Sequence, residues 1–170
     1  MLVKRSFSFS FLASGLTLGQ RLHFFIATVG GAGDSLKAPG TVGSLVALLL
    51  FYPIALQVWW VQLAAVILVS AIGVFSSHRM GQVSGKDDDQ RIVIDEVAGM
   101  WITLMFFPPT PALFIGGFLL FRVLDIVKVF PANYCDEKIH GGWGVMLDDI
   151  VSGIFGHVIL RAVLHGAHLL

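Results

Sequence analysis

The acidic residues of this chain are distributed very unevenly. Ten of the eleven Asp and Glu residues lie between positions 87 and 149, mostly where apolar segments begin or end. Seven of them form the set that we single out: Asp88, Asp95, Glu96, Asp125, Asp136, Asp148 and Asp149. Carboxylates held close together repel one another, which raises their pKa values unless a cation lies between them. Because this oxygen-rich set contains neither Cys nor spaced His pairs, it predicts a hard divalent ion, Mg²⁺, Ca²⁺ or Mn²⁺. Helix caps and surface ion pairs are the alternative.

A second candidate stretch, FRVLDIVKVFP at 121–131, places Arg122, Asp125 and Lys128 three positions apart. On a helix this spacing puts them broadly on one face, where they can form ion pairs. Charges at the edge of a membrane are costly and therefore indicate function. We expect Arg122 and Lys128 to bind phosphate oxygens, and Asp125 to hold the metal or to orient Arg122. A purely structural triad is the alternative.

Two glycine-rich stretches are expected to bring backbone groups close to a ligand. In KAPGTVGSL, residues 37–45, Gly40 and Thr41 would leave N–H groups uncovered at a helix start, which favours phosphate. The same residues also suit an ordinary helix start and close helix packing. HGGWGVMLDD, residues 140–149, is expected to be a flexible loop leading into Asp148 and Asp149 at the start of the last helix.

Apolar segments separated by short polar connectors carry these residues. The segments are too long for strands and have Gly and Pro mostly at their ends, so we predict an all-α fold. The predicted helices are 42–56, 58–77, 92–107, 112–127 and 149–164, with a Gly-rich, charged loop at 128–147. Several hold about 15 apolar residues, whereas a perpendicular span needs roughly 20. Segment 58–77 is therefore the best full span.

The composition favours a membrane protein. Hydrophobic residues make up 56% and charged residues 13% of the chain, whereas about 25% of the residues in a soluble domain are charged. A net charge of zero gives no basic footprint for nucleic acid. The length suits a single domain. The N-terminal stretch is expected to be a loosely ordered or interfacial arm.

The distribution of basic residues predicts an orientation in the membrane. They lie before 42–56, after 58–77 and after 112–127, whereas Gln57 and the turn at 108–111 carry no charge. The positive-inside rule therefore places the basic connectors in the cytoplasm. Two hairpins and a last helix then bring the acidic helix ends together. The result is a membrane-associated helical bundle of short hydrophobic helices with an acidic metal site at its cytoplasmic end.

Taken in order, these motifs resemble the phosphatidylglycerophosphatase A family. The motifs that carry the resemblance are APGTVGSL (38–45), D-x-x-x-IVIDEVAGMWITLM (88–105), FRVLDIVKVFP (121–131) and D…HGGWGVMLDDIVSG (136–153). The match covers roughly residues 24–165. It leaves residues 1–23 as an N-terminal arm outside it and 24–170 as a single helical domain.

The resemblance implies a Mg²⁺-dependent lipid phosphatase that spans the bacterial inner membrane several times, with its active site facing the cytoplasm. It would hydrolyse phosphatidylglycerophosphate in the bilayer to phosphatidylglycerol and phosphate. The catalytic residues would be Asp95, Glu96, Asp125, Lys128 and Asp149, with Glu96 as the general base. The seven acids named above would bind the metal.

Two other interpretations remain open. A non-enzymatic membrane carrier would use intramembrane carboxylates as a cation or proton path, but it would need them near mid-span. A purely structural subunit leaves the costly cluster of acids unexplained. An oligomer is compatible with all of these interpretations.

Overall fold

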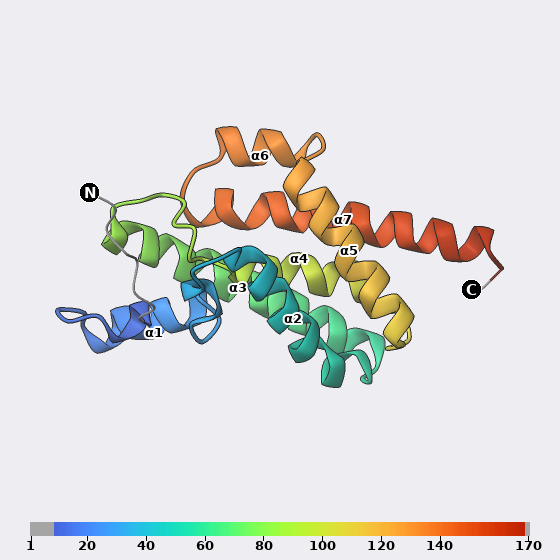
Figure 1. Cartoon of the computed structure of the whole chain (residues 1–170), viewed down its shortest axis with the longest axis horizontal. Coiled ribbons are helices and arrows are strands. Elements are labelled where there is room, and N and C mark those ends of the chain that lie inside the picture. The colour runs from blue at the N-terminus through green and yellow to red at the C-terminus, as the bar shows by residue number, and fades with distance from the viewer. Residues whose placement is uncertain (1–8, 169–170) are drawn as a thin grey trace.

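The computed structural model describes residues 9–168, apart from the side chain of Asp136. Within these residues all the regular structure is helical, so the predicted all-α fold is confirmed (Figure 1). The elements are η1 (Ser10–Leu12), α1 (Leu18–Ala27), η2 (Ala32–Asp34), α2 (Pro39–Ala55), α3 (Trp59–Ser84), α4 (Ile94–Leu104), α5 (Pro111–Val127), α6 (Ala132–Lys138) and α7 (Gly141–Gly166).

Helix α4 forms the centre of the bundle. It contacts α2, α3, α5 and α7, and ten of its eleven residues are buried. Helix α7 packs closely against it, because a Cβ on Gly153 would lie only 2.5 Å from the carbonyl oxygen of Gly99. On the other side, the indole Nε1 of Trp101 donates to the carbonyl oxygen of Ala47 in α2 at 2.9 Å. The neighbouring helices therefore fix both faces of α4.

Helix α3 is the one helix in the described part of the chain that is long and apolar enough to cross a membrane. It has 26 residues, which corresponds to about 39 Å at 1.5 Å per residue. The hydrocarbon core of a bilayer is about 30 Å thick. Only 28% of its most apolar window is buried. The predicted segment 58–77 thus extends to Ser84 and leaves most of its apolar surface outward.

The predicted loop at 128–147 is wrong, because it forms α6 and the first two turns of α7. The glycines there serve close packing. A Cβ on Gly142 would lie 1.9 Å from the carbonyl oxygen of Val74, and one on Gly144 would lie 1.9 Å from that of Ile139. Asp148 and Asp149 consequently lie in the third turn of α7 and not at a helix start, which excludes them as N-terminal caps.

The N-terminal region is folded against the bundle from Phe9 onward. Helix α1 begins with a capping box between Thr17 and Gln20 and packs on α3. It continues across the predicted boundary between residues 23 and 24. Residues 1–8 of the expected arm lie outside the described residues.

Candidate active site

Three carboxylates from three helices converge at one end of the bundle. Glu96 comes from the first turn of α4, Asp125 from the last turn of α5, and Asp149 from α7. One oxygen from each lies within 4.8 Å of the others. This spacing allows all three oxygens to coordinate the same cation. The fold thus brings together acids that are 53 residues apart in the sequence.

A cavity of about 420 Å³ opens beside this three-carboxylate cluster. Six of the seven predicted metal ligands line it: Asp88, Asp95, Glu96, Asp125, Asp148 and Asp149. The seventh, Asp136, belongs to α6, but its side chain lies outside the described part of the chain. Lys128, His140 and Pro39 also line the cavity. It therefore combines many carboxylates with a cation that can face an anionic ligand.

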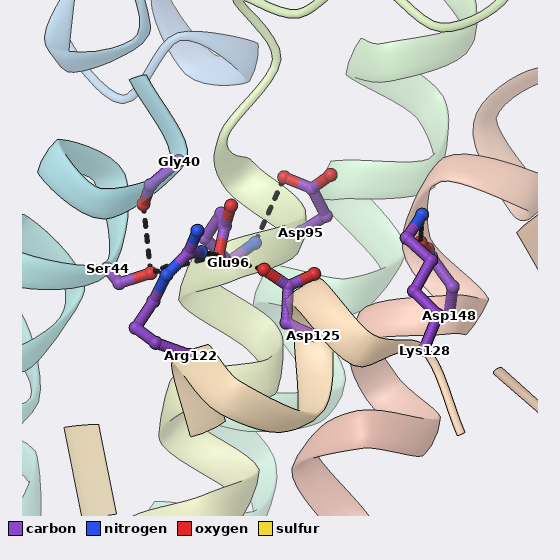
Figure 2. A network of polar contacts seen from close by, with 8 residues as sticks. All are labelled: Gly40, Ser44, Asp95, Glu96, Arg122, Asp125, Lys128 and Asp148. Atoms are coloured by element: carbon purple, nitrogen blue, oxygen red, sulfur yellow. Dashed lines mark hydrogen bonds and ion pairs between the residues drawn. The ribbon is translucent and has the colours of Figure 1, made fainter. Parts of the chain in front are cut away.

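Arg122 ties two of the clustered carboxylates together (Figure 2). Its Nη1 lies 2.6 Å from Oε2 of Glu96 and 2.8 Å from Oδ2 of Asp125. The pairing of Arg122 with Asp125 is the one that their spacing of three residues predicted. Arg122 is not among the residues that line the cavity. Its guanidinium is therefore placed to orient Glu96 and Asp125.

Lys128 binds a different helix. Helix α5 ends at Val127, and Lys128 follows in the left-handed conformation with a φ of 48°. Its Nζ donates to Oδ2 of Asp148 in α7 at 2.7 Å. The cation thus joins the end of α5 to α7 at the wall of the cavity.

The carboxylates carry more negative charge than the nearby cations offset. Burial raises the pKa of Asp95 well above its usual value, and repulsion from Glu96 and Asp148 adds to this. Burial and the charge of Asp125 raise the pKa of Glu96 to about 7, although Arg122 opposes the shift. Raised pKa values of this kind indicate that a further positive charge would stabilise the carboxylate cluster.

Asp149 supplies an independent test of whether a cation fits. Its side chain is buried, and its Oδ2 has no hydrogen-bond partner among the described residues. A buried carboxylate oxygen without a partner is strongly unfavourable. Coordination to a hard cation would satisfy it, together with the nearby oxygens of Glu96 and Asp125. The residues present therefore fit a divalent metal ion.

The two residues expected to bind phosphate through the backbone lie at the start of α2. Gly40 is against Glu96, because a Cβ there would be 2.2 Å from Oε1 of that residue. Thr41 is partly buried, and neither residue lines the cavity. Pro39 is the residue at this helix start that does so.

One polar residue of the site, Ser44, was not among the residues predicted from the sequence. It is fully buried in α2, and its Oγ donates to Oε2 of Glu96 at 2.9 Å. The available signal was a hydroxyl one turn after Gly40 in a largely apolar helix. That signal does not identify its partner, which lies 52 residues away.

The fold and the site define a class: a helical protein that holds a cluster of carboxylates and basic residues suited to a metal ion and an anionic ligand. The family model for phosphatidylglycerophosphatase A matches residues 25–164. The chain belongs to this family, and it is an enzyme that hydrolyses a phosphoric monoester.

Curated relatives agree with this assignment. Phosphatidylglycerophosphatase A of Escherichia coli (strain K12) is 40% identical over 136 residues, which is 79% of each chain. A Bacteroides thetaiotaomicron protein, provisionally named phosphatidylinositol-3-phosphatase, is 32% identical over 147 residues, covering 82% of this chain and 91% of the relative. Phosphatidylglycerophosphatase A of Haemophilus influenzae is 34% identical over 136 residues, covering 78% and 83%. No solved structure matches the chain.

Proposed function

We propose that this protein hydrolyses phosphatidylglycerophosphate to phosphatidylglycerol and phosphate, with Mg²⁺ bound at the three-carboxylate cluster. The observation that carries the proposal is the convergence of Glu96, Asp125 and Asp149 within 4.8 Å beside a cavity that Lys128 also lines. Family membership and the names of two relatives support this substrate.

The metal would be held by Glu96, Asp125 and Asp149. Asp88, Asp95, Asp136 and Asp148 are proposed as further or alternative ligands. When bound, Mg²⁺ would supply Lewis-acid stabilisation of the phosphoryl oxygens and would lower the pKa of a coordinated water. The acid-rich, thiol-free set of donors suits Mg²⁺ because this ion prefers oxygen ligands.

The chain's own basic groups would then orient and neutralise the phosphate. Lys128 lines the cavity and can donate to non-bridging oxygens of the phosphate while it stays close to Asp148. Arg122, which we expected to bind phosphate directly, is engaged with Glu96 and Asp125. Its contribution in this proposal is to hold these two carboxylates in place. Backbone groups at Gly40 and Thr41 remain proposed phosphate contacts.

When Asp95 does not itself coordinate the metal, it is better placed than Glu96 to act as the general base. One oxygen of Glu96 accepts from both Arg122 and Ser44, and Glu96 belongs to the three-carboxylate cluster. Asp95 lines the cavity and lies outside that cluster. Its carboxylate can therefore accept a proton from an attacking water without disturbing that cluster.

The proposed setting is the bacterial inner membrane, with several helices inserted and the site facing the cytoplasm. Large apolar side chains that are at least half exposed occur on most of the helices, for example Leu49, Ile67, Leu119 and Val158. Apolar surface of this extent marks contact with a membrane or another protein. We take residues 24–170 as the inserted domain. A carrier with acids at mid-span is disfavoured because the acids gather at one end of the bundle.

The test is phosphate release by the purified protein from phosphatidylglycerophosphate in mixed micelles, with Mg²⁺ and with a chelator. We expect release that stops on chelation and returns when Mg²⁺ is added. Activity that chelation leaves unchanged would refute the metal proposal. Phosphatidylinositol 3-phosphate should be assayed as the alternative substrate, because one relative is named as a phosphatase of that lipid. A preference for that lipid would overturn the assigned substrate.

A further inference from the structure

The buried hydroxyl of Ser44 lies where three helices meet at the carboxylate cluster (Figure 2). Its Oγ is 2.9 Å from the carbonyl oxygen of Gly40 in its own helix and 2.9 Å from Oε2 of Glu96 in α4. It is also 3.3 Å from Nη1 of Arg122 in α5. The side chain is fully shielded from solvent, so these groups alone determine where its proton points.

The strengths of these contacts identify the main role of the hydroxyl. Nη1 of Arg122 has two hydrogens, and its shortest contacts go to Glu96 at 2.6 Å and Asp125 at 2.8 Å. Its contact with Ser44 is therefore the weakest of the three. A serine in a helix can donate back to the carbonyl one turn earlier. A hydrogen bond to an ionised carboxylate is about twice as strong as a neutral one, so the proton of Ser44 points to Glu96.

Gly40 supports the same carboxylate from one turn earlier in α2. A Cβ at this position would lie 2.2 Å from Oε1 of Glu96 and 3.3 Å from both terminal nitrogens of Arg122. Any larger residue would have to displace the pair. Gly40 leaves room for one oxygen of Glu96, and Ser44 binds the other. The first turns of α2 thus accommodate both carboxylate oxygens of Glu96.

We propose that Ser44 is a positioning residue that fixes the Glu96 carboxylate within the three-carboxylate cluster, so that the cluster is preorganised for the metal ion. This inference rests on the proposed metal-dependent phosphatase. It gives the PGTVGS stretch a function distinct from phosphate binding. Helix α2 orients the metal ligand Glu96 through the hydroxyl of Ser44 and through the space that Gly40 leaves by having no side chain. Residues that orient ligands in this way typically affect metal affinity or activity by about 10- to 100-fold.

The test compares Ser44→Ala with Ser77→Ala. Ser77 is equally buried in an apolar helix, but its Oγ has no hydrogen-bond partner among the described residues. Mn²⁺ alone is the probe, and its affinity for each purified protein is measured by electron paramagnetic resonance. We expect Ser44→Ala to weaken Mn²⁺ binding about 10- to 100-fold and to lower kcat by a similar factor. KM for the lipid should stay close to the wild-type value.

The outcomes separate the possible failures. Equal Mn²⁺ affinity and kcat for Ser44→Ala and wild type would overturn the positioning role. A loss of affinity that Ser77→Ala shares would also overturn it, because general loosening would then be the cause. Gly40→Ala is a second test of the contact between α2 and Glu96 and should weaken Mn²⁺ binding. Gly116→Ala, with nothing within 4 Å of the new Cβ, should leave Mn²⁺ binding unchanged. If the wild type released no phosphate from phosphatidylglycerophosphate, the proposed function would fail while the Mn²⁺ affinities still decided the role of Ser44.

Discussion

Helices α3 and α4 are both apolar in sequence, but the structure uses them in opposite ways. Nearly all of α4 is buried, and its first turn supplies Asp95 and Glu96. Most of α3 is not covered by the chain, with Ile67 and Leu68 both 61% exposed. Helix α4, at 11 residues, is also too short to cross a bilayer, whereas α3 is long enough.

The difference shows that hydrophobicity has two separate roles in this molecule. Around α4 it provides the low-dielectric surroundings that make each carboxylate interaction strong and each unpaired charge costly. Along α3 it provides an outward surface that water would not favour. Substitutions of the two kinds should therefore damage different properties. Those at the α4 end should affect chemistry, and those on the outer face of α3 should affect membrane integration.

The largest effect is expected at the carboxylate cluster around α4. Asp149→Asn keeps the size of the side chain but removes a charge that would bind the metal. Such an interaction contributes several kcal/mol to the transition state, so kcat should fall on the order of 10³-fold. Phosphate release measures this, with Glu137→Gln on the exposed face of α6 as the control. Activity within a few-fold of wild type would show that Asp149 lies outside the reaction centre.

The next effect concerns the outer face of α3. Ile67 lies within the apolar part of this helix, and a charged residue near the centre of a span costs about 2.5–3.5 kcal/mol. Ile67→Arg should therefore lower the fraction of protein that stays in membranes after alkaline carbonate extraction, whereas Ile67→Leu should not. Full retention of the Arg variant would mean that this face of α3 does not contact lipid.

The sequence predicts those features of the fold and site that depend on neighbouring residues in the chain, and it does not predict those that depend on contacts between helices. Long apolar runs broken by Gly, Pro and charged residues predict the helices, and the concentration of acids between 87 and 149 leads to six of the residues that line the cavity. The start of α7 was mistaken for a loop because Gly142 and Gly144 look flexible until their tertiary neighbours are known. The hydrogen bond of Ser44 was not predicted because its partner, Glu96, is in another helix. Burial of α4 and exposure of α3 likewise depend on packing, which apolar composition alone does not specify.

A smaller effect is expected where α4 crosses α7. A Cβ on Gly99 would lie 2.4 Å from Cε2 of Phe121 and 2.6 Å from the carbonyl oxygen of Asp149. Overpacking of this kind costs about 1–3 kcal/mol, so Gly99→Ala should lower the free energy of unfolding in detergent. Gly116→Ala, on α5 with nothing within 4 Å of the new Cβ, should be neutral or slightly stabilising. Equal stability of the two variants would mean that α4 and α7 are less tightly packed than the structure indicates.

The smallest effect is expected in the connector between α3 and α4. Burial acts to raise the pKa of Asp89, but hydrogen bonds from the side chain and backbone of Arg91 outweigh it, so the pKa falls below 3.8. A pKa that is lower in the folded state than in the unfolded state stabilises the fold at pH values above the unfolded-state pKa. This stabilisation is lost as the pH falls through the folded-state pKa. Because the Arg91 side chain is 40% exposed, solvent screening limits the contribution to about 1 kcal/mol or less. Asp89→Asn should therefore reduce the free energy of unfolding at pH 6 and have little effect near pH 2. An equal loss at both pH values would assign the effect to packing of the side chain and not to its charge.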